Sequence, residues 1–307
     1  MTRATYTEIV CKSALNRVTG MPFRWSLNPY RGCVHACAYC YARATHAWFG
    51  LNAGDDFERR ILVKANVVEV LRREVRRRGW AGESIAIGTA TDPYQPCEGR
   101  FRLTRGILET LLEQGNPLSI VTKSTLVLRD LDLLARLATE TDVAVYFTVT
   151  TLDERLWRVL EPGTPPPAKR LAVLRRLRDA GVPAGVFMAP ILPGLTDSAA
   201  SIAAVAAAAR EHGALSFSAP PLRLDPLVKE HYFGVVAAKF PELLPRYERA
   251  YAGANPPPVY AAALARRVAA VRRQFGFADG AMPPRGGAGS VSAIAPAARG
   301  GQLALPI

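Results

Sequence analysis

Short apolar segments alternate with helical segments from residue 25 to residue 222, and this alternation constrains the fold more than any other feature. Strand-like segments are predicted at residues 25–28, 84–89, 118–122, 143–149, 184–189 and 214–218. Most are rich in β-branched or aromatic residues, as buried parallel strands are. Helical periodicity lies between them, at residues 67–78, 105–114, 130–138, 169–180 and 198–211. Asp197 or Ser198 is expected to cap the last of these helices.

Alternating strands and helices predict βα units around a parallel sheet. Six such units would form an open, partial (β/α)6 barrel, in which functional groups gather where the strands end. Polar side chains follow three of the predicted strands: Thr89, Thr91 and Asp92, then Lys123 and Ser124, then Thr148 and Thr150. These residues are therefore candidates for one shared site.

The segments on either side of the barrel have a different character. Residues 1–24 are predicted to be an irregular lead-in, residues 25–222 the barrel, and residues 223–276 a basic helical extension. Residues 277–307 are rich in Gly, Ala, Pro and Ser and carry almost no charge, which predicts a disordered tail. Neither a long apolar run nor a signal-like N-terminus is present, so a cytoplasmic location without a membrane partner is expected.

Three of the five cysteines, Cys33, Cys37 and Cys40, lie within eight residues in the spacing C-x3-C-x2-C. Thiolates hold iron–sulfur clusters, and three thiolates on one loop would leave one iron of a 4Fe–4S cluster open to another ligand. Zinc is the alternative, with His35 or His46 as a fourth ligand, but zinc sites usually pair C-x2-C with a second pair of ligands. The spacing favours the cluster.

The chain carries 39 Lys and Arg against 26 Asp and Glu, a formal net charge of +13. Such an excess favours polyanionic partners, nucleic acid above all. The basic residues cluster at Arg72, Arg73 and Arg76–Arg78, at Lys169 and Arg170, at Arg175, Arg176 and Arg178, and at Arg266, Arg267, Arg272 and Arg273. Solvated helix faces would also explain these clusters, because charge runs on helices commonly face water.

The cysteine motif, with Tyr39 between its second and third cysteines, resembles the radical S-adenosylmethionine superfamily. The resemblance implies a partial (β/α)6 barrel, a 4Fe–4S cluster on Cys33, Cys37 and Cys40, and S-adenosylmethionine bound to the open iron. It also implies reductive cleavage to a 5′-deoxyadenosyl radical, which abstracts hydrogen from the substrate. An external one-electron reductant is then required.

Further stretches resemble the branch of the superfamily that contains spore photoproduct lyase. They are Tyr39 and Tyr41 around the third cysteine, residues 88–92 (GTATD), residues 122–124 (TKS), residues 161–164 (EPGT) and residues 184–190 (AGVFMAP). The resemblance covers residues 25 to about 220. It implies that Thr91, Lys123, Thr148 and Ala189 bind S-adenosylmethionine, with Lys123 on the cofactor carboxylate.

This branch implies repair of a thymine dimer of the spore photoproduct type in DNA, through hydrogen abstraction at C6 and cleavage of the methylene bridge. The lyase quenches its product radical with a cysteine, and Thr89 stands at that position here. Two interpretations of Cys97, eight residues on, stay open: a small buried thiol, or a thiol on a loop that folds back over the barrel mouth. In the second interpretation Cys97 would donate hydrogen, with Tyr39 or Tyr41 as a relay.

Two alternatives stay open at this point. The first is a radical enzyme that acts on another substrate, such as a modified RNA base or a peptide, and the change at Thr89 supports it. The second is a non-catalytic iron–sulfur protein that binds nucleic acid. The candidate cofactor residues at the strand ends speak against that second alternative, while the oligomeric state is left undetermined.

Overall fold

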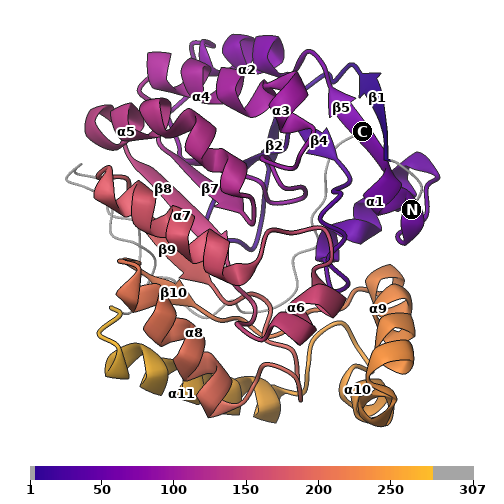
Figure 1. Cartoon of the computed structure of the whole chain (residues 1–307). Coiled ribbons are helices and arrows are strands. Elements are labelled where there is room, and N and C mark those ends of the chain that lie inside the picture. Colours follow the sequence, from indigo (N-terminus) through magenta and orange to yellow (C-terminus); the bar gives the residue numbers. More distant parts are fainter. Residues whose placement is uncertain (1–3, 279–307) are drawn as a thin grey trace.

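A parallel sheet forms the centre of the protein (Figure 1). The computed structural model describes residues 4–278. Six strands run parallel, in the order β10 (Phe217–Ser218), β9 (Ala184–Phe187), β8 (Val143–Thr148), β7 (Leu118–Thr122), β6 (Ile85–Ile87) and β3 (Trp25–Leu27). The predicted six-stranded partial barrel is confirmed. An additional strand, β2 (Leu15–Arg17), pairs antiparallel with β3 at one edge.

Helices connect successive strands and lie around the sheet (Figure 1). The main ones are α2 (Val67–Val75), α4 (Leu103–Glu113), α5 (Leu131–Glu140), α7 (Pro167–Asp179) and α8 (Ala199–Glu211). Each matches a predicted helix to within a few residues. The Ser198 hydroxyl caps α8 by accepting a hydrogen bond from the Ser201 amide at 3.0 Å. Shorter helices lie in the connections: η1 (Tyr41–Phe49), α1 (Asp55–Arg59), α3 (Glu98–Phe101), η2 (Thr125–Asp130) and α6 (Glu154–Leu160).

A second, three-stranded sheet was not predicted. Its order is β1 (Thr5–Ile9), β5 (Arg60–Lys64) and β4 (Tyr30–Arg31), with β1 parallel and β4 antiparallel to β5. The prediction of an irregular lead-in is therefore wrong for β1 and β2. Both strands pair with segments that lie later in the chain, and β1 meets a partner 55 residues away, so no local pattern announces it.

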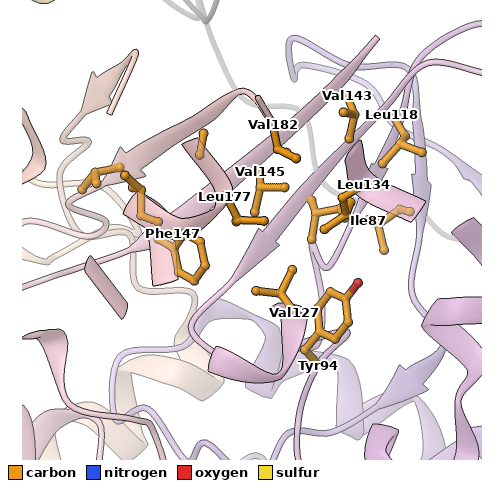
Figure 2. Packing of buried hydrophobic residues seen from close by; sticks show 14 of the residues in the cluster. Ile87, Tyr94, Leu118, Val127, Leu134, Val143, Val145, Phe147, Leu177 and Val182 are labelled. Carbon is orange, nitrogen blue, oxygen red and sulfur yellow. The ribbon is translucent and has the colours of Figure 1, made fainter. Parts of the chain in front are cut away.

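Aliphatic and aromatic side chains of the central strands and their covering helices make one core. Figure 2 shows Ile87, Val145 and Phe147 of the strands packed with Leu134 of α5 and Leu177 of α7. All five side chains are fully buried. This packing fixes the strands, and with them the positions at which the strands end.

Residues 223–276 are largely helical, in α9 (Pro226–Lys239), η3 (Pro241–Leu243), α10 (Leu244–Ala250) and α11 (Pro258–Gln274). A separate apolar cluster joins α9 and α10 to the cysteine loop, through Val228, Tyr232 and Tyr247 on one side and Cys37 and Tyr39 on the other. The predicted disordered tail lies almost entirely outside the described residues. Among residues 4–278 no helix is long and apolar enough to cross a membrane.

Candidate active site

A cavity of about 360 Å³ lies where strands β6 to β9 end. Nine of the ten predicted site residues line it: Cys33, Cys37, Tyr39, Cys40, Tyr41, Thr91, Lys123, Thr148 and Ala189. The cysteines and the two tyrosines come from the segment after β4, and the others come from the ends of four further strands, β6 to β9. The fold therefore brings together residues that are as many as 156 positions apart in the sequence, from Cys33 to Ala189.

The β6–α3 loop holds one side of the cysteine loop. The Thr91 hydroxyl donates to the Gly32 carbonyl at 2.6 Å, and Gln95 donates to the same carbonyl at 3.1 Å. Gln95 also accepts a hydrogen bond from the Val34 amide at 3.2 Å. Thr91, which was predicted to bind cofactor, lines the cavity and also supports the loop that carries the cysteines.

A turn at residues 161–164 holds the other side of the cysteine loop. The Gly163 amide donates to the His35 carbonyl at 3.1 Å, and the Ala38 amide donates to the Leu160 carbonyl at 2.9 Å. The approach is close enough that a Cβ atom at Gly163 would lie 2.1 Å from the Val34 carbonyl oxygen. Only glycine fits this contact without displacing the backbone, so the turn clamps the loop.

Glu161, the first residue of this turn, belongs to a buried ionic group. The Glu161 carboxylate pairs with Arg170 at 2.5 Å and accepts a hydrogen bond from the Tyr39 hydroxyl. Burial alone would raise the pKa of Glu161, but Arg170 and Lys123 outweigh it and lower that pKa to about 2. Arg170 also donates to the Thr148 carbonyl at 2.9 Å, which ties the clamp to the end of β8.

Arg170 corrects an expectation from the sequence. Lys169 and Arg170 were read as a basic cluster that faces solvent or phosphate, but Arg170 is fully buried. The side chain points inward because Glu161 and the Thr148 carbonyl accept its hydrogen bonds. The shared motif at residues 161–164 was the one signal in the sequence that could have identified this group.

Asp92 and His35 form a second buried ion pair, with His35 Nδ1 3.2 Å from Asp92 Oδ2. Burial alone would lower the pKa of His35, but Cys33 and Asp92 outweigh it and raise that pKa to about 10. Asp92 also accepts hydrogen bonds from the Thr122 hydroxyl at 2.8 Å and the Lys123 amide at 2.7 Å. This carboxylate therefore fixes the end of β7 relative to the cysteine loop.

The donor set fits an iron–sulfur cluster better than zinc. No group of three or more His, Cys, Asp and Glu side chains within residues 4–278 is arranged to hold a single metal ion. Three thiolates that each bind a different iron do not need to converge on one point. The two proposed zinc partners are engaged elsewhere, His35 with Asp92 and His46 with the Arg60 carbonyl at 3.1 Å.

Lys123 presents a free cation to the cavity. Among the described residues its ammonium group has no hydrogen-bond or ion-pair partner, and it lies 5.7 Å from the centre of the Tyr39 ring. Burial alone would lower the pKa of Lys123, but Cys37 and Glu161 outweigh it and raise that pKa. The lysine therefore stays charged at neutral pH and can pair with a bound carboxylate.

Cys97 is not where the sequence suggested. It lies just before α3 in the main apolar core, is 5% exposed and does not line the cavity. Glu98, next in the chain, turns inward, accepts a hydrogen bond from the Tyr30 hydroxyl and pairs with Arg129 at 2.6 Å. These contacts hold the loop against the core, so it does not fold over the barrel mouth.

The two tyrosines of the motif differ in their surroundings. The Tyr39 hydroxyl is buried between Glu161 and Thr150, with the Thr150 hydroxyl at 2.8 Å. Tyr41 lines the cavity, is 44% exposed, and donates to the Thr89 carbonyl. Tyr39 is therefore locked in place, whereas the Tyr41 phenol stands at the cavity wall.

Comparisons with known proteins agree with this geometry. The sequence model of the radical SAM superfamily matches residues 27–205. An uncharacterised protein of Mycobacterium tuberculosis is 42% identical over 283 residues, which cover 91% of this chain and 83% of the relative. An uncharacterised protein of Methanocaldococcus jannaschii is 32% identical over 190 residues, which cover 62% of this chain and 69% of the relative.

The fold also resembles solved structures of spore photoproduct lyase. One of them, complexed with dinucleoside spore photoproduct, superposes with a TM-score of 0.64 at 18% identity and covers 88% of this chain and 79% of the lyase. A mutant of the lyase with bound S-adenosylmethionine and the same dinucleoside gives a TM-score of 0.64 at 17% identity, with the same coverage.

Proposed function

The chain belongs to the radical S-adenosylmethionine superfamily, and from that premise we propose that it repairs a thymine dimer of the spore photoproduct type in DNA. Members of the superfamily use a 4Fe–4S cluster and S-adenosylmethionine. When bound, these two groups supply a 5′-deoxyadenosyl radical. One observation supports the proposal most strongly: three cysteines and the strand-end residues line a single cavity within a lyase-like fold.

The cavity residues have separate tasks in this proposal. Cys33, Cys37 and Cys40 hold the cluster, since they are the three thiols that line the cavity in the described part of the chain. Lys123 pairs with the methionine carboxylate of the cofactor. The Thr148 hydroxyl, which has no hydrogen-bond partner among the described residues, and the Ala189 backbone line the space beside it.

DNA is the partner that the charge of the protein favours. The net charge is +13, and Arg223 stands exposed at the edge of the cavity. Phosphate contacts from such residues would position the strand without reading its sequence. The reaction in the cavity is hydrogen abstraction from C6 of the bridged thymine, followed by cleavage of the methylene C–C bond.

The proposal assigns the hydrogen donor to Tyr41 and not to Cys97. Cys97 lies in the core, and the thiols at the cavity are those of the cluster ligands. Tyr41 is the phenol at the cavity wall, and it rests against Thr89, the residue that replaces the cysteine of the lyase. In the repair reaction Tyr41 therefore takes the donor role that was assigned to Cys97.

Replacing Lys123 with methionine is expected to weaken S-adenosylmethionine binding about 10- to 100-fold, because a charge-assisted hydrogen bond in a buried site is lost. Equilibrium titration of the iron-loaded protein with the cofactor measures this effect. Lys169→Met, on the exposed face of α7, is the matched control and should bind as the parent does. Equal affinities of parent and Lys123→Met would remove Lys123 from the cofactor site.

Incubation of the reduced, iron-loaded protein with S-adenosylmethionine and a synthetic dinucleotide spore photoproduct tests the substrate. The expected result is conversion of the photoproduct to the unlinked thymine dinucleotide, which chromatography measures. Cys97→Ala should convert it as cleanly as the parent, whereas Tyr41→Phe should release by-products from an unquenched radical. Cleavage of the cofactor without any loss of photoproduct would contradict the proposal.

A second candidate is a radical enzyme that acts on a modified RNA base or a peptide. It is favoured by two observations: Thr89 and not a cysteine follows β6, and Cys97 lies in the apolar core outside the cavity. The same incubation separates the two candidates. If the protein cleaves S-adenosylmethionine slowly and the photoproduct does not speed this cleavage, the result supports the RNA-base or peptide substrate.

A further inference from the structure

Part of the cavity wall consists of apolar side chains that have no task in the binding of the cluster or the cofactor. They are Met21, Phe23, Val121, Phe187, Pro220, Pro221 and Leu222. None of these side chains can donate or accept a strong hydrogen bond. They are called the apolar wall below. The same cavity therefore has a polar part, with Lys123 and the cysteines, and a part that can hold only an apolar surface.

The apolar wall borders the opening of the partial barrel. Met21 and Phe23 lie on the loop between β2 and β3, and Pro220, Pro221 and Leu222 follow β10. β2 and β10 are the two edge strands of the central sheet, and the sheet does not close between them. Segments from both edges thus reach the same cavity, and a molecule that enters from outside would meet them.

Phe187 gives the apolar wall a fixed aromatic surface. It pairs with Thr148 in the sheet, and its ring stacks on Tyr146 with the ring centres 4.3 Å apart and the planes 13° apart. Tyr146 does not line the cavity, whereas the partly buried Phe187 does. One face of the Phe187 ring is therefore covered by Tyr146, and this stacking holds the ring in place at the cavity.

The loop between β2 and β3 supplies an adaptable apolar side chain. The Val18 amide donates to the Arg24 carbonyl at 2.7 Å, which closes the loop, and Gly20 has a φ of 73° within it. Met21 follows and is 54% exposed, although it lines the cavity. A flexible thioether adapts to the shape of a bound molecule, and exposed apolar side chains at a cavity are typical of binding sites.

A flat ring fits the apolar wall better than an extended peptide does. The two faces of a nucleobase are apolar and its polar atoms lie at the ring edge, so a face can lie on Phe187 without losing hydrogen bonds. A peptide carries polar groups along its whole backbone, and Pro220 and Pro221 have no N–H to pair with them. The exposed Arg223 follows Leu222 at the same cavity and suits a neighbouring phosphate.

We propose that the apolar wall is the substrate subsite, and that it holds a nucleobase stacked on Phe187 and covered by Met21. Stacking on an aromatic side chain tolerates any base, so the subsite selects the class of substrate and not the sequence. The inference rests on the proposed function in one respect, that the substrate is a nucleic acid that enters this cavity. It does not require the base to be part of a photoproduct.

The test compares a fluorescein-labelled thymidine tetranucleotide with an abasic strand that has the same sugars and phosphates. Fluorescence anisotropy measures the binding of each strand to the iron-loaded protein with S-adenosylmethionine. We expect the parent to bind the thymidine strand about tenfold more tightly, because only that strand can stack. Phe187→Leu keeps an apolar side chain without a ring, so this preference should fall to about twofold or less, while the abasic strand binds as before.

Phe49→Leu is the matched control. It makes the same substitution at a ring that is 44% exposed and does not line the cavity, and it should keep the preference of the parent. Met21→Ser, on the exposed loop, is the second variant and should lower the preference about threefold. If the Phe187→Leu protein does not fold, Met21→Ser carries the same comparison.

Three outcomes would overturn the inference. Equal binding of both strands by the parent would show that the cavity holds no base. A preference that Phe187→Leu and Met21→Ser both keep would place the base elsewhere. Weaker S-adenosylmethionine binding by Phe187→Leu, measured by equilibrium titration, would assign the ring to the adenine of the cofactor.

The incubation with photoproduct is read separately from these binding assays. If the parent prefers the thymidine strand through Phe187 and yet converts no photoproduct, the nucleobase subsite stands and the thymine dimer is the wrong substrate. If Phe187→Leu converts the photoproduct with the KM of the parent, the proposed function stands and the subsite is wrong.

Discussion

Replacement of any one of Cys33, Cys37 and Cys40 by alanine is expected to abolish the brown chromophore and the cleavage of S-adenosylmethionine. Each thiolate binds a different iron, and the described chain offers no neighbouring side chain to take its place, because His35 and His46 are engaged by Asp92 and the Arg60 carbonyl. Iron and sulfide analysis of anaerobically purified protein measures the loss, from about four irons per chain in the parent.

Cys97→Ala and Cys11→Ala are the matched controls, since each removes a thiol that lies outside the cavity. Both should keep the iron content of the parent. Stoichiometric zinc in place of iron, or a cysteine-loop variant that keeps its chromophore, would contradict the assignment of the cluster.

Gly163→Ala is expected to lower both iron retention and thermal stability. The added methyl group would lie 2.1 Å from the Val34 carbonyl oxygen, and both partners are backbone, so the clamp or the cysteine loop must move. Overpacking of this kind costs about 1–3 kcal/mol. Because part of that cost falls on the loop, iron should be lost on gel filtration more readily than from the parent, and the melting temperature should fall.

Gly234→Ala serves as the control for this variant. The new methyl group on α9 would meet no atom within 4 Å, and alanine favours the helix, so stability should stay equal or rise by about 0.5–1 kcal/mol. A Gly163→Ala protein that keeps its iron and melts with the parent would show that the turn at residues 161–164 does not clamp the loop.

The barrel could be predicted because each of its strands is recognisable locally. Residues 118–122 (LSIVT), for example, form an apolar run of the length of a buried strand, and the structure gives Leu118–Thr122. The small sheet could not be predicted in this way. Residues 5–9 (TYTEI) are largely exposed and polar, and their strand conformation depends on pairing with β5, which lies 55 residues further on.

In the candidate site, too, some residues could be placed from the sequence and others could not. Motif and strand-end position were enough to place Lys123 and Thr148 at the cavity. They were not enough for Cys97, because distance along the chain does not say to which side a loop folds, and the Glu98 contacts decide that. They also failed for Arg170, since a buried arginine and a solvated one look alike in a sequence until the Glu161 partner is known.

The 122-residue separation of Tyr39 and Glu161 sets the order in which the site can be assembled during synthesis. The cysteines leave the ribosome early, but the Tyr39 hydroxyl finds its acceptor only after Glu161, 122 residues later, has been made. At about 5–20 residues per second the cysteine loop waits roughly 6–24 s for that partner. Throughout that interval the three closely spaced thiols are on an unfinished chain that still lacks the turn at residues 161–164, which holds their loop in the folded protein.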